Sequence, residues 1–542
     1  MTQKSESKSS AELDHKNDQK VGVKHIVDGI TSDEDDQIIT EKHADVTLKL
    51  FEEYEASAGE LTPELERRIK WKLWTIILPI VFFVNFMLFL DKNAMGYASL
   101  LGLFEDADLD QQKYNDLQTI FYAGYILFQL PSHWAFQKFK LSHYISAVTV
   151  VWTITTFTTL SVKDFGHLAA IRFFLGAFES GVTAAIQHTI AMWFTPAEQA
   201  IVNPIFWISC IAQGIPGGLT AYGTQFVPSI SPWKVYWIII GGLSAILSIS
   251  SFFFYPDNPA TYKYFTVQER IHVIKRIKAA THSSIEQKTF KKAQAIEGLK
   301  DPITWLFGIY VFLSMLCNNI SFQSAIIYKN LGFSNLNSTL VSVASSGWTT
   351  IASIWGSLCL VYFRTQSAHV GTFFALIALL GGIIAVAIPF RYNYGILAGI
   401  FLTNSNANTF IMAFSWSQSS AAGYSKRLIR TVIWSVFYGA SNLAAPQIWK
   451  AKDKPRYRPA WIIMIICSWF LAPLILQVIR FILARRNKQR LQLLQDIKDG
   501  KIEDPHGFIT SIDEEGNKIK TEVDVSMLDL TDWENKKFIY PL

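Results

Sequence analysis

Four ionisable side chains lie inside otherwise apolar stretches of the N-terminal half of this chain. Asp91 and Lys92 are adjacent, and Glu179 follows Arg172 by seven residues. An ionised group at membrane depth is costly, so such residues usually face a cavity and take part in transport. The two pairs are therefore the first candidates for binding a charged ligand or a proton.

The spacing of these residues constrains how they can pair. Neighbours on an α-helix point about 100° apart, so Asp91 and Lys92 cannot face one another and each needs another partner. Arg172 and Glu179 share a helix face and differ by about 10 Å in depth. We expect Arg172 to lie near the depth of Asp91 and to form a cross-helix ion pair with it. Lys92 would then be free for an anionic ligand.

Glu179 is the candidate proton carrier. It is flanked by Phe178, Ser180 and Gly181, with no base beside it in the sequence. Burial disfavours the charged form of a carboxyl group, so we expect this residue to bind and release a proton. Two simpler interpretations stay open. Glu179 can be hydrogen-bonded permanently within a helix bundle, and Lys92 can be an interfacial lysine whose ammonium reaches the headgroup region.

The C-terminal half supplies neutral polar groups, because no Asp or Glu occurs between Asp301 and Asp453. The amides that stand out in its apolar stretches are Asn318, Asn319, Gln323 and Asn404. In membranes such groups join helices about as often as they bind a ligand.

Apolar stretches of about 20 residues predict the elements that hold these side chains. The chain has 542 residues, of which 50% are hydrophobic and 14% aromatic. This composition indicates an all-α membrane protein with twelve transmembrane helices in two six-helix bundles. The expected spans are 74–98, 114–135, 142–162, 167–191, 199–223, 233–255, 303–327, 338–363, 369–390, 394–415, 428–448 and 459–483.

Five segments follow from this pattern. We expect a disordered cytoplasmic tail (1–72), an N-terminal bundle (73–255), a basic cytoplasmic loop (256–302), a C-terminal bundle (303–484) and a cytoplasmic tail (485–542). Basic short loops stay on the cytoplasmic side, which places both termini there. The basic stretch from Lys450 to Arg458 disagrees with this orientation, and the Asn337 glycosylation sequon would lie outside.

Several other classes of function lack support in the sequence. The chain has no phosphate-binding loop motif and no nucleophile elbow, so no enzyme activity is indicated. Its four cysteines fall in predicted spans without metal-ligand spacing, so we expect no metal or cofactor. The net charge of +5 comes from short segments beside spans, which does not suggest nucleic-acid binding.

Several motifs resemble the anion:cation symporter branch of the major facilitator superfamily, and within it the fungal allantoate permease family. The matching stretches are Phe89-Leu90-Asp91-Lys92-Asn93, Arg172-Phe173-Phe174-Leu175-Gly176-Ala177-Phe178-Glu179-Ser180, Pro256-Asp257-Asn258-Pro259, Ala445-Pro446-Gln447 and Asp529-Leu530-Thr531-Asp532-Trp533-Glu534-Asn535. The resemblance runs from about residue 45 to the end of the chain.

The resemblance implies alternating access and proton-coupled uptake of a small, usually anionic, nutrient at the plasma membrane, with cysteine as the favoured cargo. It assigns proton coupling to Asp91 and Glu179, and substrate binding to Lys92 and Arg172. Asn318, Asn319, Gln323 and Asn404 complete the predicted binding set. Lys92 stands where related symporters commonly have Arg, which removes a planar bidentate donor. The expected partners are a proton, membrane lipids and an anionic or zwitterionic small molecule.

Two alternatives remain at this stage. The same fold can carry allantoate, ureidosuccinate, a dipeptide, a vitamin or a sulfonate. A protein of another class, a nutrient sensor that binds without transporting, would also need the cavity residues. Such sensors usually have long structured tails, whereas the tails here look disordered.

Overall fold

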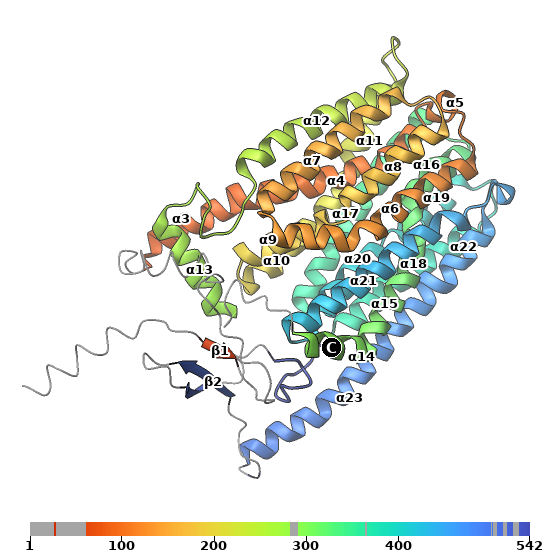
Figure 1. Ribbon diagram of the computed structural model, residues 1–542. Coiled ribbons are helices and arrows are strands. Elements are labelled where there is room, and N and C mark those ends of the chain that lie inside the picture. Colours follow the sequence, from red (N-terminus) through yellow and green to blue (C-terminus); the bar gives the residue numbers. More distant parts are fainter. Residues whose placement is uncertain are drawn as a thin grey trace, which may run out of the picture.

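The computed structural model describes residues 26–28, 61–281, 291–363, 366–499, 501, 507–512, 518–523 and 530–542. Within these residues the chain forms twelve helical rods, six on each side of the segment 255–301. The predicted all-α membrane architecture of two six-helix halves is therefore confirmed for the bundle (Figure 1).

The N-terminal half begins earlier than expected. Its first helix starts at Pro63, so the last part of the predicted tail belongs to the bundle, and residues 1–25 and 29–60 lie outside the described part of the chain. The rods are α3 (Pro63–Lys72), η3 (Leu73–Ile77) and α4 (Leu78–Ala98); α6 (Gln111–Lys138); α7 (Leu141–Thr158); α8 (Phe165–Glu179) and α9 (Val182–Trp193); α10 (Pro196–Ala212) and α11 (Gly214–Thr224); and α12 (Pro232–Phe254).

The C-terminal half has the same number of rods. They are α15 (Pro302–Met315), η5 (Leu316–Asn319) and α16 (Ile320–Asn330); α17 (Asn335–Tyr362); α18 (Ser367–Ala387); α19 (Asn393–Thr403) and α20 (Asn406–Ser419); α21 (Tyr424–Ala444) and η6 (Ala445–Ile448); and α22 (Arg458–Met464), η8 (Ile465–Leu471) and α23 (Ala472–Lys498). Short helices α5 (Leu103–Asp106), η4 (Thr159–Ser161) and η7 (Ala451–Asp453) lie in connections.

Local sequence signals explain where several rods begin. Asp110 and Asp164 each accept a backbone N–H of the first turn that follows them, which satisfies a donor that the helix cannot pair internally. Thr195 and Glu198 form a capping box at the start of α10, where Pro196 occupies the first turn. Each of these rods therefore starts directly after a polar side chain that caps its first turn.

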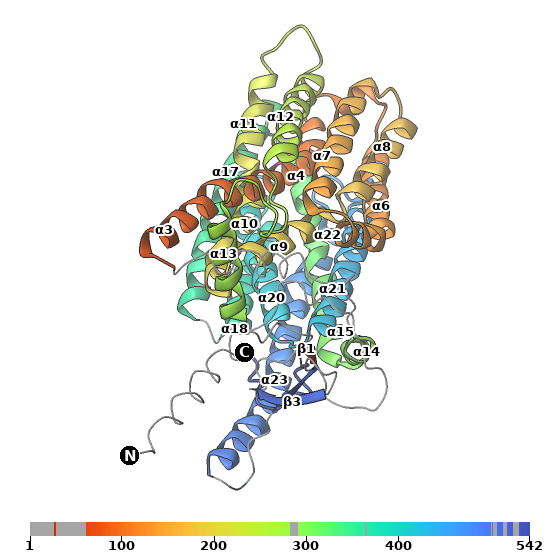
Figure 2. The same ribbon diagram turned by 60° about the vertical axis from the view of Figure 1, so that its left-hand side comes forward.

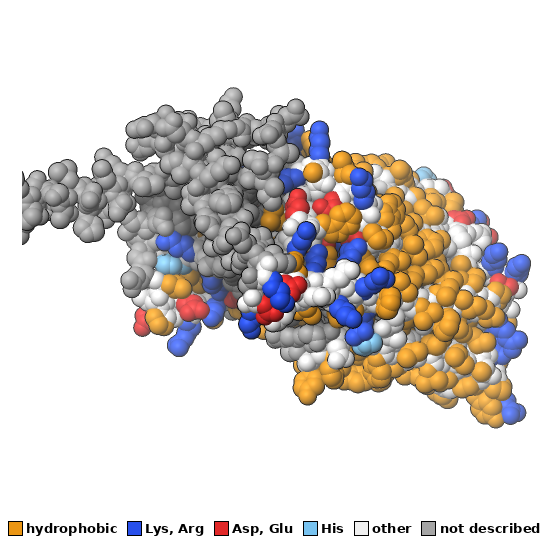
Figure 3. Space-filling model, turned by 90° about the horizontal axis from the view of Figure 1, so that it is seen from below, with side chains coloured by type: hydrophobic (Ala, Val, Ile, Leu, Met, Phe, Trp, Pro, Cys, Tyr) orange, Lys and Arg blue, Asp and Glu red, His pale blue; other side chains and the backbone are white. Residues whose placement is uncertain are grey.

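Seven rods are long and apolar enough to cross a membrane by length and composition: Pro63–Ala98, Leu141–Ser161, Phe165–Trp193, Pro232–Phe254, Pro302–Asn330, Ser367–Ala387 and Arg458–Lys498. Figure 3 shows hydrophobic side chains over broad areas of one face of the molecule, and lysine and arginine side chains border these areas. The other five rods contain α6, α10 and α11, α17, α19 and α20, and α21. All five contribute residues to the central cavity described below.

The two ends of the bundle differ (Figures 1 and 2). We call the end that carries α13 (Val267–Thr281), α14 (Lys292–Lys300) and residues 530–542 the basal end, and the end that carries α5 the distal end. A small antiparallel sheet adds strands β1 (Ile26–Asp28), β2 (Gly507–Ile512) and β3 (Lys518–Val523) in the order β1-β2-β3.

The segment after the C-terminal bundle differs from the predicted tail. Helix α23 continues to Lys498, beyond the expected boundary at 484, and residues 530–542, here called the terminal segment, pack against the basal end. Trp416 Nε1 donates to Pro541 O at 2.8 Å, and Asn487 Nδ2 donates to Tyr540 O at 2.8 Å. The expectation of disorder is wrong for this segment.

Lys426 anchors the terminal segment through charge. Its Nζ lies 2.8 Å from Asp532 of the terminal segment, and 2.7 Å from Glu297 and 3.5 Å from Asp301 at the end of α14. Burial alone would raise the pKa of Asp532, but the adjacent Lys426 and the hydrogen bond from Tyr540 hold that pKa below its ordinary value. The carboxylate is therefore ionised at neutral pH and keeps the segment docked.

Candidate functional site

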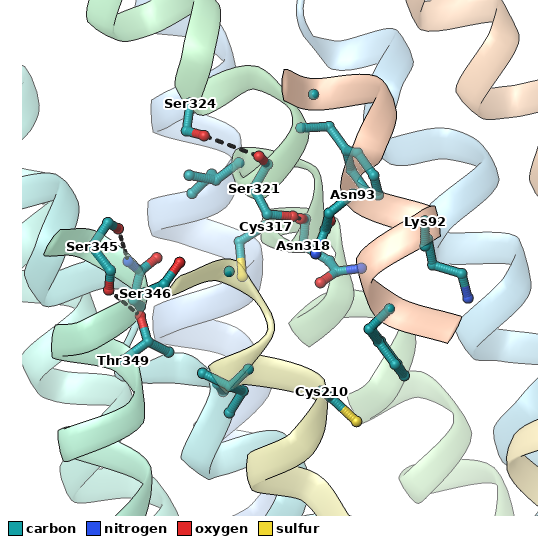
Figure 4. Close-up of a pocket in the computed structure, with 18 of the residues that line it drawn as sticks. Lys92, Asn93, Cys210, Cys317, Asn318, Ser321, Ser324, Ser345, Ser346 and Thr349 are labelled. Atoms are coloured by element: carbon teal, nitrogen blue, oxygen red, sulfur yellow. Dashed lines mark hydrogen bonds between the residues drawn. The ribbon is translucent and has the colours of Figure 1, made fainter. Parts of the chain in front are cut away.

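A cavity of about 280 Å³ lies between the two halves. Helices α4, α6, α10 and α11 form its wall on the N-terminal side, and α16, α17, α20 and α21 contribute on the C-terminal side. Figure 4 shows Lys92 and Asn93 on one side of this space and Ser345, Ser346 and Thr349 on the other. A chamber at the junction of two such halves is the place where transporters hold their cargo.

Lys92 is the one charged side chain among the described residues that line this cavity. It is buried, and its Nζ lies 5.1 Å, 5.3 Å and 5.5 Å from the ring centres of Phe89, Phe121 and Tyr125. Aromatic faces attract a cation and hold it away from water. The ammonium group is therefore held inside the bundle among these rings, on the side of α4 away from Ser345 and Thr349 (Figure 4), which argues against an interfacial lysine.

Glu179 is the partner of Lys92. Its Oε2 lies 3.5 Å from Lys92 Nζ, and the glutamate side chain is fully buried. Among the described residues neither carboxylate oxygen accepts a closer hydrogen bond. The expectation that Lys92 is left free is wrong, because Glu179 on a neighbouring helix reaches it.

Close packing of α6 against α8 positions the residues around this pair. A Cβ atom on Gly176 would lie 2.0 Å from Phe121 O, and one on Gly124 would lie 2.2 Å from Phe173 O. Only glycine allows α6 and α8 to approach this closely, as small residues do at helix interfaces in membranes. The approach sets Phe121 and Tyr125 of α6 beside the residues at the end of α8.

Asp91 and Arg172 are both buried but do not form the predicted ion pair. Asp91 Oδ1 accepts a hydrogen bond from Thr156 Oγ1 at 3.1 Å. Arg172 interacts electrostatically with both Asp91 and Glu179, yet no salt bridge joins Asp91 and Arg172 among the described residues. Asp91 instead finds its nearest partner on α7, which the sequence had not indicated.

Three of the six predicted substrate ligands line the cavity: Lys92, Asn318 and Asn404. Arg172, Asn319 and Gln323 are buried outside its wall. Gln323 Nε2 donates to Asn115 Oδ1 at 2.8 Å and joins the two halves on the distal side. Its position outside the wall is explained by this inter-half contact.

A stripe of hydroxyl groups on α17 was not among the predicted site residues. Ser342, Ser345, Ser346 and Thr349 all line the cavity. Their spacing of three, four and seven residues from Ser342 is that of a single helix face. That periodicity inside an apolar span was the signal that could have identified this wall.

Contacts between the halves lie on both the distal and the basal side of the cavity. On the distal side Gln111 Nε2 donates to Gln323 Oε1 at 3.0 Å, and Asn115 Nδ2 donates to Trp449 O at 2.7 Å. On the basal side the ring of Trp207 lies 5.7 Å from that of Phe410 and 5.8 Å from that of Phe414. The distal contacts are polar and include the Asp116 carboxylate, which accepts from Gln447 Nε2 at 3.0 Å, whereas the basal contact is aromatic.

Comparison with known proteins identifies the architecture. The model of the Major Facilitator Superfamily matches residues 81–446. The chain belongs to this superfamily. It is 43% identical to an uncharacterized transporter of Schizosaccharomyces pombe, over 89% of this chain and 85% of that one.

Two further relatives carry the name of a cargo. The chain is 41% identical to the high affinity cysteine transporter of Saccharomyces cerevisiae, over 96% of this chain and 100% of the relative. It is 26% identical to the allantoate permease of the same yeast, over 92% and 90% of the two chains. These matches confirm the resemblance and show a multi-pass membrane transporter of the superfamily, not an enzyme.

Proposed function

We propose that this chain is a proton-coupled secondary active transporter that imports a small amino acid or organic anion, with cysteine favoured, by alternating access. The observation that carries the proposal is the pair of Lys92 and Glu179, 3.5 Å apart, beside a cavity between the halves. A buried acid beside the cavity's one charged lining residue is what coupled binding of a proton and an anion requires.

The coupling step follows from competition for Lys92. While Glu179 is ionised, its carboxylate neutralises the ammonium group, and a substrate carboxylate must displace it. A proton on Glu179 removes that competitor and leaves Lys92 to the substrate. Binding of the proton and binding of the anion then favour one another to the same extent, as linkage requires. Asp91 and Arg172 act on this pair through their charges.

Alternating access fits the contacts on either side of the cavity. Opening to the distal side requires the hydrogen bonds among Gln111, Asn115 and Gln323 to break, and opening to the basal side requires Trp207 to leave Phe410 and Phe414. The distal set also includes bonds from Gln447 to Asp116 and Thr119, and both sets would be exchanged as the halves rock about the cavity.

The cavity favours a small cargo of low net charge. Its volume of about 280 Å³ lies at the lower limit for ligand pockets, and its described lining holds one cation and no carboxylate. A monoanion or a zwitterion fits a lining with one positive charge and no negative charge. The similarity to the cysteine transporter favours cysteine, and the similarity to the allantoate permease makes allantoate the second candidate.

We place the protein in the plasma membrane with the basal end in the cytoplasm. The basal end carries Lys426, Arg430 and Arg486, in keeping with the excess of basic residues on the cytoplasmic side. The basic stretch from Lys450 to Arg458 lies at the distal end and disagrees with this orientation. Part of it is explained, because Arg456 donates to the carbonyl oxygens of Val386 and Ile388 and so caps the end of α18.

Uptake of radiolabelled cysteine into cells that express the chain tests this function. We expect accumulation to rise as external pH falls and to collapse when a protonophore removes the gradient. A cell line that expresses the Glu179→Gln variant at equal surface abundance is the control for background transport. Accumulation that persists at full rate with the protonophore would contradict proton coupling.

A further inference from the structure

The terminal segment connects the basal ends of five helices. It is bonded to residues of α14, α18, α20, α21 and α23. Figures 1 and 2 mark the C-terminus at this end of the bundle. None of residues 530–542 lines the cavity, so the segment does not contribute to the candidate site directly. Its contacts instead constrain how these helices can move.

One of the five helices, α20, carries two rings of the basal contact between the halves. These are Phe410 and Phe414, which lie 5.7 Å and 5.8 Å from the ring of Trp207 on α10. We call the three rings the basal gate, because they must part for the proposed opening to the basal side. Trp416 follows on the same helix, is buried, and donates from Nε1 to Pro541 O at 2.8 Å. The terminal segment therefore holds the helix that carries two of the gate rings.

The other end of α20 is a break in its rod. Helix α19 ends at Thr403 and α20 begins at Asn406. The N–H groups of Asn404 and Ser405 donate to carbonyl oxygens three residues earlier, at 3.2 Å and 3.1 Å. A short stretch of this tighter winding within a rod often marks a hinge. The break gives α20 a point about which it can tilt relative to α19.

The gate rings and Trp416 share packing partners on neighbouring helices. The ring of Trp416 lies 5.4 Å from Phe307 of α15. The ring of Trp434 on α21 lies 5.5 Å from both Phe410 and Phe414, and 6.4 Å from Phe307. Because these rings pack in one continuous group, α20 cannot carry its two gate rings away from the N-terminal half while Trp416 stays in place.

The terminal segment is itself held by buried polar contacts to helices other than α20. Asp532 and Lys426 of α21 are both buried and lie 2.8 Å apart. Asn487 of α23 pairs with the backbone of Tyr540 in both directions, donating to its O at 2.8 Å and accepting from its N at 2.9 Å. These contacts can persist while α20 tilts. The bond from Trp416 is the one that tilting would break.

We propose that the terminal segment is a latch on the basal gate. When docked, it holds α20 in the position where Phe410 and Phe414 meet Trp207, and its release favours opening at the basal end. A contact that exists in only one of two conformations shifts their equilibrium by its own free energy. The inference rests on the proposed alternating access for the motion of α20, and it is independent of proton coupling and of the cargo.

Labelling of the cavity thiols measures opening at each end. Cys210 and Cys317 line the cavity, whereas Cys359 and Cys467 do not. In the full-length chain with Cys359 and Cys467 replaced by Ser, a membrane-impermeant thiosulfonate is added to intact cells or to inside-out vesicles. The two preparations expose opposite ends of the protein. Cleavage by added trypsin at the exposed Lys498, at the basal end of α23, shows which preparation exposes that end.

The decisive variant is Trp416→Phe, which keeps an aromatic ring and removes the donor to Pro541. We expect its basal labelling to be about threefold to tenfold faster than that of the wild type, the weight of one hydrogen bond, with no increase from the distal end. Trp305→Phe is the matched control, because Trp305 Nε1 donates to Leu299 O at 2.7 Å, a basal bond of the same kind outside the terminal segment. It should be labelled at the wild-type rate.

A chain that ends at Asp529 lacks the latch altogether. It should be labelled from the basal end at least as fast as Trp416→Phe. A synthetic peptide of residues 530–542, added on the basal side, should slow this labelling, and a peptide of the same composition in scrambled order should not. Failure of the native peptide to slow a folded truncated chain would contradict the latch.

Basal labelling of Trp416→Phe at the wild-type rate would overturn the latch, whatever the truncated chain does. Faster labelling from both ends would also overturn it, since that result would show general loosening of the bundle. Basal opening by Trp416→Phe in a protein that takes up no substrate would support the latch and contradict the proposed transport function. Normal uptake with unchanged basal labelling would do the opposite, so the two failures are distinguishable.

Discussion

At the scale of single residues, the separation between Lys92 and Glu179 decides how both behave. A buried ion pair is stable only with good geometry and further hydrogen bonds. Here the two groups are 3.5 Å apart and the carboxylate has no closer described partner. The pair is therefore easily exchanged for a protonated acid and a bound anion.

Lys92 should control affinity for the anionic end of the substrate. We expect Lys92→Ala to raise the apparent KM for cysteine about tenfold or more, because a charge-assisted hydrogen bond is lost. Lys92→Arg should retain part of the affinity, since charge persists while its geometry changes. The measurement is the concentration dependence of uptake at equal surface expression. An unchanged KM in Lys92→Ala would remove this residue from the site.

The residues that carry charge could be found from the sequence, but their partners could not. Asp91, Lys92, Arg172 and Glu179 stand out because ionised groups are rare in apolar spans. The pairing of these four side chains depends on how α4 and α8 are rotated about their axes. It also depends on how closely the two helices pack beside α6. Those quantities are set by tertiary packing, so the predicted pairing of Asp91 with Arg172 failed.

At the scale of elements, two glycines hold α6 against α8. We expect Gly176→Ala to destabilise the protein by about 1–3 kcal/mol, because the added Cβ would overlap Phe121 O and force the helices apart. The check is the melting temperature of the purified protein. Gly242→Ala in α12 is the control, since its Cβ meets nothing within 4 Å. Equal melting temperatures for the two variants would contradict this account of the helix contact.

The terminal segment is a second structural element with a testable role. Asp532→Asn should weaken docking by about 1–3 kcal/mol, because Lys426 keeps Glu297 and Asp301 but loses one charged partner. Since the pKa of Asp532 is lowered, the wild-type contact persists at neutral pH and is lost only as pH falls through that lowered value.

Limited proteolysis of the purified protein measures this docking. Cleavage within 530–542 should be faster for Asp532→Asn than for the wild type. The exposed residue Lys536 provides a control, and Lys536→Gln should be cleaved at the wild-type rate apart from loss of its own cleavage site. Equal protection of Asp532→Asn and wild type would show that the ion pair does not hold the segment.

Helix number and order were predictable from apolar runs, whereas the terminal segment was not. Residues 530–542 contain Thr531, Asp532 and Glu534 beside Trp533 and Tyr540, and such a mixed composition suggests a loop. Their order arises from partners far away in the chain, including Glu297 and Asn487. No local pattern encodes those contacts, so the expectation of a disordered tail was wrong here.

At the scale of the whole molecule, the distal hydrogen bonds set the balance between conformations. Gln323→Leu removes bonds to Gln111 and Asn115, each contributing about 1 kcal/mol, so we expect the distal-open state to become about tenfold or more populated. Cys210 and Cys317 line the cavity and report this change through labelling by a membrane-impermeant thiosulfonate added outside.

The control for that labelling is Asn319→Leu, a neighbouring amide outside the cavity wall that takes no part in the distal bonds. It should be labelled at the wild-type rate. Faster labelling of Gln323→Leu supports distal closure by the amide network, and labelling at the wild-type rate would mean that other contacts hold the distal side.

The central claim is that a proton on Glu179 enters together with the substrate, and substrate-driven proton flux tests it most directly. Purified protein in liposomes with an internal pH indicator should acidify the lumen when cysteine is added outside. Glu179→Gln, which mimics the protonated acid, should exchange labelled for unlabelled cysteine without moving protons. Acidification by Glu179→Gln at the wild-type rate would contradict the account.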